Sequence, residues 1–157
     1  MANKIIDYVS GIEISSGPEE LGAVQPFSKI LIEDYGYPKE NLRTRPQWRV
    51  KKSPSDTKGK YPLDIAVFSD ANHSDDSLYI VVECKKPDWK KGRKQLEDYM
   101  RLSNAKLGVW FNGSDVMYLE KKMSKKGPLF YEIPNIPPYG KSVNDIGKYL
   151  RKDLVAS

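Results

Sequence analysis

The stretch LYIVVECKKPDW, residues 78–89, joins an apolar run directly to charged side chains. Its first five residues have the composition of a buried strand, and no turn separates them from Glu83, Cys84 and Lys85. Because successive side chains of a strand point to opposite faces, Glu83 and Lys85 share one face and Cys84 lies on the other. The pattern therefore predicts a carboxylate and an ammonium side by side at the end of a buried strand.

A second carboxylate stands inside the preceding apolar segment, YPLDIAVF, residues 61–68. Alternation in this segment predicts a strand that carries Asp64, Ala66 and Phe68 on one face. A polar loop connects it to the first stretch, so we expect the two strands to pair as a long-looped hairpin. Asp64 and Glu83 would then approach each other.

Two carboxylates that are buried together are costly unless a cation lies between them. Mg²⁺ prefers such hard oxygen ligands, and a metal-bound water beside a phosphodiester can hydrolyse it. Lys85 would orient or help deprotonate that water, or stabilise charge on the phosphate. The alternative is structural: Glu83 and Lys85 form an ion pair at a strand end, and Asp64 caps a turn. The residue types alone leave both interpretations open.

A helix is predicted over residues 16–35, before these strands. Ser16 and Glu19 have the spacing of a capping box. Gly22 and Pro26 fall in the middle of this helix and can kink or split it.

The remaining pattern completes a mixed sheet. Further strands are predicted at residues 47–52, 106–112, 115–122 and 128–133, and further helices at 93–105 and 143–154. Leu96, Tyr99 and Met100 should face inward from the helix at 93–105, with Leu102 as a further candidate. The order of elements predicts an α/β fold with a mixed central β-sheet flanked by helices.

Composition restricts the class of protein. The chain has 157 residues, about one domain, and no apolar run long enough to cross a membrane. With no signal peptide and a single cysteine, it is expected to be cytoplasmic and to have no membrane contact. The single histidine, His73, is predicted to lie solvated in a loop, which disfavours a histidine-based metal centre or a Ser-His-Asp triad.

The formal net charge is +5, and Lys and Arg gather in residues 43–60 and 85–94. Two local basic blocks suit a polyanion such as nucleic acid. The alternative is that solvated lysines simply keep the protein soluble.

Three segments resemble a known family: YPLDIAVF, VVECKKPDWKKGRKQLEDYMRLS (residues 81–103) and LGVWFNG (107–113). They look like the nuclease domain at the N-terminus of type I restriction enzyme R subunits (HsdR), of the PD-(D/E)xK phosphodiesterase superfamily. The resemblance covers most of the chain and implies a restriction-endonuclease-like fold with an αβββαβ core. The motif residues occur in the family's order, D…ExK…QxxxY, as Asp64, Glu83, Lys85, Gln95 and Tyr99. The chain departs from a literal PD pair, because Leu63 separates Pro62 from Asp64.

The resemblance implies a Mg²⁺ site, in which Mn²⁺ can substitute. Asp64 and Glu83 would bind the metal, the backbone carbonyl of Cys84 would be a further ligand, and Lys85 would be the catalytic lysine. The Cys84 side chain, on the opposite face, is expected to fill the core rather than act as a nucleophile.

The same resemblance implies roles for residues on the two helices. Gln95 and Tyr99 would support the catalytic site or hold the DNA backbone near it. The first helix of such folds often contributes an acid, for which Glu20 is the first candidate and Glu19 the second. A helix cap or a partner of the helix dipole is the alternative role for that acid.

With this fold, the basic blocks would contact double-stranded DNA, mostly through its phosphates and with little sequence preference. The candidate DNA-binding residues are Lys86, Lys90, Lys91, Arg93, Lys94, Arg45 and Arg49. Trp48 and Trp89 can stack on bases, but packing within the protein is the favoured role for both. Methyltransferase and specificity subunits of a restriction complex are the further partners that the resemblance implies.

We expect an N-terminal extension at residues 1–17, a nuclease domain at 18–140, and a C-terminal helix or connector at 141–157. The sequence contains no P-loop, GxxxxGK[ST]. The chain is therefore either the N-terminal piece of a longer protein, which is the favoured expectation and in which ATP would serve a following helicase domain, or a free-standing homologue. A RecB-like repair or recombination nuclease and a non-catalytic nucleic-acid-binding module that kept the fold remain alternatives. The intact D…ExK pattern argues against the second alternative.

Overall fold

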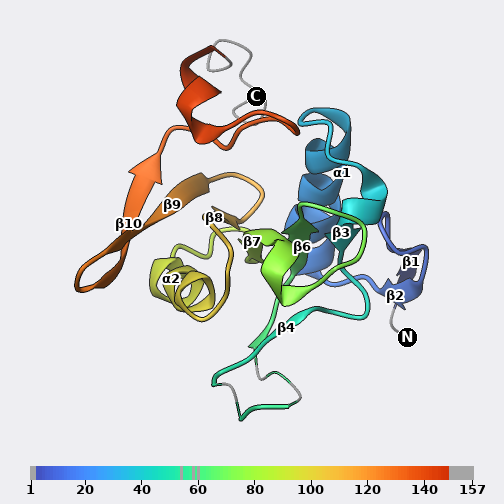
Figure 1. Cartoon of the computed structure of the whole chain (residues 1–157). Coiled ribbons are helices and arrows are strands. Elements are labelled where there is room, and N and C mark those ends of the chain that lie inside the picture. Colours follow the sequence, from blue (N-terminus) through green and yellow to red (C-terminus); the bar gives the residue numbers. More distant parts are fainter. Residues whose placement is uncertain (1–2, 54, 58, 60, 149–157) are drawn as a thin grey trace.

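The computed structural model describes residues 3–148, apart from 54, 58 and 60 (Figure 1). A six-stranded sheet runs in the order β10-β9-β8-β7-β6-β3. Its strands are β3 (Leu42–Arg43), β6 (Ile65–Phe68), β7 (Leu78–Cys84), β8 (Leu107–Phe111), β9 (Val116–Ser124) and β10 (Gly127–Ile133). Helix α1 (Gln25–Glu33) packs on one face and α2 (Arg93–Arg101) on the other. The predicted mixed sheet flanked by helices is confirmed.

Strand β7 lies inside the sheet and sets its mixed character. It pairs antiparallel with β6 and parallel with β8, and α2 makes the crossover between the two parallel strands. The strands β8, β9 and β10 then continue as antiparallel hairpins. The succession α1, β3, β6, β7, α2, β8 has the expected αβββαβ order.

The two faces of β7 are buried against different helices. Ile80, Val82 and Cys84 belong to the core under α1, and Val81 belongs to the core under α2, together with Leu96. Full burial of one such aliphatic side chain stabilises the fold by about 1.5–3 kcal/mol. The alternation carries on past the apolar run, so Glu83 and Lys85 lie on the α2 face.

The predicted first helix is split. A π-helical segment, η1 (Glu20–Val24), precedes α1, and the Gln25 amide donates to the Glu20 carbonyl five residues back. Pro26 has no N–H to offer the Gly22 carbonyl, which removes one α-helical hydrogen bond at this point. The predicted cap is wrong, because the Ser16 hydroxyl donates to the Asn3 carbonyl instead.

The strand predicted at residues 47–52 is mostly absent and does not join the main sheet. Only β4 (Arg49–Val50) forms there, and it pairs with β5 (Tyr61–Pro62) in a separate two-stranded ladder. The edge of the main sheet is formed by β3 instead, where Leu42 pairs with Val67.

The predicted strand at residues 61–68 is interrupted at Leu63 and Asp64, between β5 and β6. The Leu63 amide donates to the Trp48 carbonyl, at 2.8 Å. The Asp64 side chain accepts from the Cys84 amide, also at 2.8 Å, so a carboxylate takes the place of a backbone acceptor. Leu63 consequently packs with Ala66 and Phe68, not on the face that alternation predicts for it.

Helix α2 is shorter than predicted. It ends at Arg101, which leaves Leu102 38% exposed, whereas Leu96, Tyr99 and Met100 are buried as predicted. The assignment of Leu102 to the core is therefore wrong.

His73 lies in a loop, as predicted, but it is half-buried rather than fully solvated. Its ring stacks on Phe68 with centroids 4.5 Å apart, and its Nε2 lies 2.6 Å from the Glu40 carbonyl oxygen.

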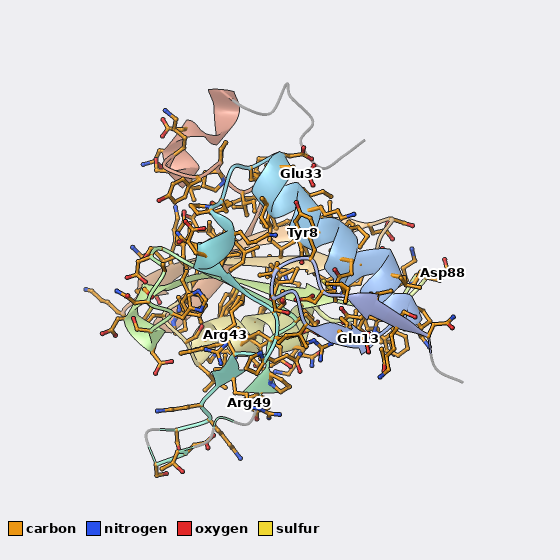
Figure 2. The ribbon with its side chains drawn as sticks, turned by 90° about the vertical axis from the view of Figure 1, so that its right-hand side faces the viewer. Tyr8, Glu13, Glu33, Arg43, Arg49 and Asp88 are labelled. Atoms are coloured by element: carbon orange, nitrogen blue, oxygen red, sulfur yellow. The ribbon has the colours of Figure 1, made fainter. Side chains whose placement is uncertain are left out.

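Residues before the first helix form a hairpin of β1 (Lys4–Ile6) and β2 (Glu13–Ser15), which lies beside α1 (Figure 1). The Tyr8 hydroxyl donates to Glu33 Oε2 at 3.2 Å, and Figure 2 shows Tyr8 against α1. Short 3₁₀ turns occur at η2 (Lys39–Asn41), η3 (Asp75–Ser77) and η4 (Val143–Lys148). The last one is the described part of the predicted C-terminal helix, and residues 149–157 lie outside the described residues.

Candidate active site

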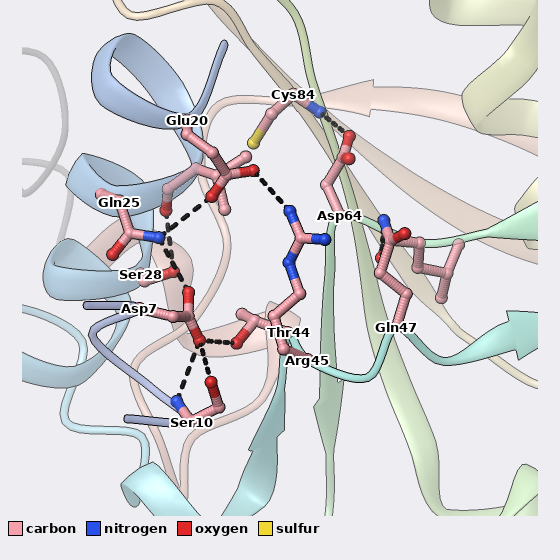
Figure 3. A network of polar contacts seen from close by, with 12 residues as sticks. Asp7, Ser10, Glu20, Gln25, Ser28, Thr44, Arg45, Gln47, Asp64 and Cys84 are labelled. Carbon is pink, nitrogen blue, oxygen red and sulfur yellow. Dashed lines mark hydrogen bonds and ion pairs between the residues drawn. The ribbon is translucent and has the colours of Figure 1, made fainter. Parts of the chain in front are cut away.

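Asp64 and Glu83 lie together where β6 begins and β7 ends. Asp64 Oδ2 accepts a hydrogen bond from the Cys84 amide, whose residue follows Glu83 (Figure 3). Burial, and after it the charge of Glu83, raises the pKa of the Asp64 carboxyl well above its usual range. The expected approach of the two carboxyl groups is thus present, and the charge of Glu83 makes ionisation of Asp64 more costly.

Glu83 is 5% exposed, and its two oxygens have different surroundings. Oε1 lies 3.2 Å from the Lys85 ammonium, whereas Oε2 is buried without a hydrogen-bond partner. Burial raises the pKa of Glu83, although Lys85 acts in the opposite direction. The ion pair of the structural interpretation therefore exists, but it satisfies only one of the two oxygens, and Asp64 caps no turn.

Lys85 connects the strand to α2. Its ammonium donates to Gln95 Oε1 at 2.8 Å, and Gln95 Nε2 donates to the Tyr99 hydroxyl at 2.7 Å. Burial, and after it the charge of Glu83, raises the pKa of Tyr99 to about 12, so Tyr99 stays a neutral phenol. The structure brings together all five motif residues, from Asp64 to Tyr99, while their chemical roles stay predictions.

The loop before α2 fixes this arrangement. Gly92 has φ +150°, and a Cβ placed there would lie 2.3 Å from Trp110 Nε1. That indole nitrogen donates to the Lys91 carbonyl at 3.1 Å. Because no side chain fits at Gly92, the chain passes close to the sheet here, which holds the first turn of α2 near Lys85.

The acid of the first helix that faces the site is Glu19, not Glu20. Burial raises the pKa of the Glu19 carboxyl, Lys85 lowers it, and its carboxyl interacts with Asp64. Glu20 instead pairs with Arg45 at 3.1 Å and accepts from Gln25 Nε2 at 3.0 Å. The order of the two candidates is therefore reversed, because Glu19 interacts with Asp64 and Lys85, whereas the partners of Glu20 are Arg45 and Gln25; a metal-binding role for either acid stays a prediction.

A polar network that the sequence prediction missed supports this helix (Figure 3). Asp7 is 1% exposed and accepts from Gln25 Nε2 at 2.8 Å and from the Thr44 hydroxyl at 2.5 Å. Burial raises the pKa of Asp7, but hydrogen bonds from Thr44, Gln25 and Ser10 outweigh it, and the pKa is lowered. Gln25 therefore links the N-terminal hairpin to Glu20.

The donor set fits a divalent cation. Among the described residues, no three His, Cys, Asp or Glu side chains form a ready-made metal site. Mg²⁺, however, is usually bound by one or two carboxylates and several waters. Asp64 and Glu83 supply two adjoining carboxylates, and the buried Glu83 Oε2 lacks any partner.

The Cys84 side chain fills the core, as predicted. It is fully buried under α1, and burial raises the pKa of its thiol, which stays protonated. The backbone carbonyl of Cys84 stays a predicted ligand.

Acidic neighbours offset part of the positive charge around the site. Four of the seven predicted DNA-binding side chains form ion pairs: Lys90 with Asp115 (2.5 Å), Arg93 with Glu97 (2.8 Å), Lys94 with Asp98 (3.7 Å) and Arg45 with Glu20 (3.1 Å). The Lys86 ammonium lies 5.6 Å from the centre of the Trp89 ring, and Lys91 and Arg49 are exposed. The electrostatic attraction to DNA is therefore weaker than the sequence count of basic residues suggests.

The two tryptophans differ in their packing. Trp48 packs edge-on against Phe68, with ring centroids 5.1 Å apart, as predicted. Trp89 is 43% exposed, so the packing role favoured for it is wrong.

Comparison with known proteins gives one match. The family model described as type I restriction enzyme R protein N terminus (HSDR_N) matches residues 19–137. That range begins at Glu19 and includes every strand of the six-stranded sheet. No curated protein and no solved structure gives a significant match. Among the described residues, no helix has the length and apolar character needed to cross a bilayer.

Proposed function

Because the chain belongs to the family of type I restriction enzyme R protein N termini, we propose that it is the DNA-cleaving domain of such a subunit. The proposed reaction is hydrolysis of a phosphodiester within double-stranded DNA, with Mg²⁺ or Mn²⁺ as cofactor. The observation that carries this proposal is the meeting of Asp64, Glu83 and Lys85 at the ends of two paired strands.

Asp64 and Glu83 would hold the cation. When bound, a divalent cation lowers the pKa of a water molecule and offsets negative charge on a phosphate. Without a cation, burial and the charge of Glu83 raise the pKa of Asp64, so the pair does not readily carry two negative charges; this supports the assignment.

Lys85 would act on the phosphate or on the attacking water. Its ammonium is held between Glu83 Oε1 and Gln95 Oε1, at 3.2 and 2.8 Å. A lysine that is held by two acceptors keeps one N–H for a third partner, because an ammonium has three donors. That remaining donor can stabilise a phosphate oxygen or orient a water.

Gln95 and Tyr99 would position this lysine. The Gln95 amide uses its oxygen on Lys85 and its nitrogen on Tyr99, so its orientation is fixed. Tyr99 accepts from Gln95 and, as a neutral phenol, can donate its own proton to a phosphate or a carboxylate.

The proposed partners are duplex DNA and, within a restriction complex, methyltransferase and specificity subunits. We also propose a cytoplasmic location, and an ATP requirement only for a helicase domain that follows on a longer chain. Family membership supports these proposals, and the basic residues near α2 support the contact with DNA.

A plasmid-nicking assay tests the proposal. Nicking should require Mg²⁺ or Mn²⁺, and Lys85→Ala should reduce its rate by about 100-fold or more. Lys126→Ala, in the turn between β9 and β10, removes the same charge at an exposed position and should leave nicking unchanged. Nicking that persists in a chelator, or that Lys85→Ala leaves intact, would refute the proposed function.

A further inference from the structure

Trp89 presents an exposed aromatic ring on a fixed backbone. Its side chain is 43% exposed, although its backbone is held at both polar atoms. The Trp89 amide donates to the Lys86 carbonyl at 3.2 Å, and its carbonyl accepts from Asn112 Nδ2 at 2.9 Å. Asn112 is itself fully buried, so the ring is displayed from a rigid support.

The ring borders the candidate active site. A hollow of about 250 Å³ is lined by Lys85, Trp89, Lys91, Gly92, Lys94 and Gln95. Two of these residues, Lys85 and Gln95, are the hydrogen-bonded pair described above. The hollow is smaller than a typical site for a drug-sized ligand, which suits a single planar ring.

The charges around the hollow suit a nucleic acid strand. Lys85, Lys91 and Lys94 line it, and the Lys86 ammonium lies 5.6 Å from the centre of the Trp89 ring. Asp98 only partly offsets Lys94, because the two groups are 3.7 Å apart and exposed. Lysines beside an aromatic face are the combination that holds single strands, where phosphates contact the cations and bases stack on the ring.

We propose that Trp89 stacks on an unpaired DNA base next to the phosphate that Lys85 contacts. In a duplex the faces of the bases are covered by their neighbours, so only an unstacked base can offer its face to this ring. The preferred substrate is therefore DNA that is single-stranded or locally opened beside the cleavage point. Every base has a π-face, so the contact selects strand structure rather than sequence. This inference rests on the proposed function.

The test measures binding of the full chain to a fluorescein-labelled single strand and to the blunt duplex of the same sequence, in a chelator. Trp89→Ala should weaken single-strand binding by about tenfold, the typical loss for one stacked base. Trp89→Phe should restore most of that affinity, and duplex binding should change by less than about twofold. Tyr139→Ala is the matched control, because Tyr139 is an aromatic residue of similar exposure. Its amide donates to the Tyr35 carbonyl, just past the C-terminal end of α1, so this substitution should change neither affinity.

A second measurement reports stacking directly rather than through affinity. The emission of 2-aminopurine, placed in the single strand, should fall on binding to the wild type and not on binding to Trp89→Ala. Equal losses for both DNA forms, no loss for either, or wild-type binding to duplex alone would overturn the inference. The nicking assay is independent: metal-dependent nicking with an unchanged Trp89→Ala affinity overturns the stacking alone, whereas absence of nicking and of all DNA binding overturns both proposals.

Discussion

Lys85 donates a hydrogen bond to Gln95 across 2.8 Å, from the end of β7 to the first turn of α2. The contact crosses between two elements that are separated in the chain only by the loop at residues 86–92. Gly92 and Trp110 hold this loop against the sheet. The lysine and the amide are therefore positioned before any substrate arrives.

Replacement of Gln95 should impair cleavage more than folding. Gln95→Ala removes an exposed side chain, so the free energy of unfolding should change by less than about 1 kcal/mol. Loss of its bond to the charged Lys85 should slow nicking by about tenfold or more. Thermal unfolding and nicking rates, measured on the same preparations, check both expectations. A lowered melting temperature with normal nicking by the folded fraction would show instead that Gln95 serves packing.

Asp64 should be required for binding of a divalent cation. Titration calorimetry with Mn²⁺ should show binding to the wild type that Asp64→Ala abolishes, because one of the two adjoining carboxylates is then missing. Asp70→Ala removes an acid from an exposed loop and serves as the control. Equal Mn²⁺ affinity in the wild type and Asp64→Ala would remove Asp64 from the metal site.

The two neighbouring acids of the first helix should respond differently to neutralisation. Glu20→Gln breaks the pair with Arg45 and should cost about 1 kcal/mol of stability, while Mn²⁺ affinity stays unchanged. Glu19→Gln removes a charge that interacts with Asp64 and should weaken Mn²⁺ binding by about fivefold, or about 1 kcal/mol. Calorimetry and thermal unfolding of both variants measure these effects. A loss of Mn²⁺ affinity in Glu20→Gln but not in Glu19→Gln would restore Glu20 as the metal-facing acid.

Without metal, the protein should lose stability as the pH rises. Burial and Glu83 raise the pKa of Asp64 in the folded state above its unfolded value. The unfolded state therefore releases this proton first, and the stabilising contribution of the neutral carboxyl, present at low pH, is lost as the pH rises toward the folded pKa. Melting temperatures in a chelator at about pH 5 and about pH 8 measure this loss. Asp64→Asn, which can still accept from the Cys84 amide, should flatten the dependence; an equal slope in both proteins would contradict the assignment.

DNA binding should be salt-dependent and nearly independent of sequence. Seven neutralised phosphates would give a log–log slope of about −6. Because four of the seven candidate residues already pair with acids, we expect a shallower slope. Fluorescence anisotropy over a range of salt concentrations, with two unrelated sequences, provides the measurement. A salt-insensitive complex that prefers one sequence would contradict the electrostatic interpretation.

The central sheet could be predicted because its strands have one dominant signal. Residues 78–82 and 107–111 are apolar runs within strands that are buried on both faces, and the Asn112-Gly113 turn marks where the second one ends. The motif on β7 and α2 could be placed for the same reason, since strand alternation and helical spacing fix which side chains share a face.

The sequence prediction failed where a side chain replaces a backbone hydrogen-bond acceptor, or where a partner distant in the sequence determines which of two adjacent residues faces the site. Alternation cannot reveal that Asp64 accepts from the Cys84 amide and interrupts its own strand. Spacing cannot decide between Glu19 and Glu20, because the choice depends on Arg45, which is distant in the sequence. No sequence pattern identifies Asp7 as a buried hydrogen-bond acceptor, because its partners Ser10, Gln25 and Thr44 lie in three separate segments of the chain.

The residues that match the family model do not include all the residues that stabilise the fold. The family match begins at Glu19, yet the carboxylate that receives the Gln25 and Thr44 donors belongs to Asp7. A protein trimmed to residues 19–137 would leave those two donors without that acceptor, at a cost of about 1–3 kcal/mol for each one that stays buried. Its loosened first helix would then carry Glu19 less firmly toward Asp64. A protein shortened to residues 19–137 should therefore bind Mn²⁺ more weakly and nick DNA more slowly than the full chain, although every motif residue is retained.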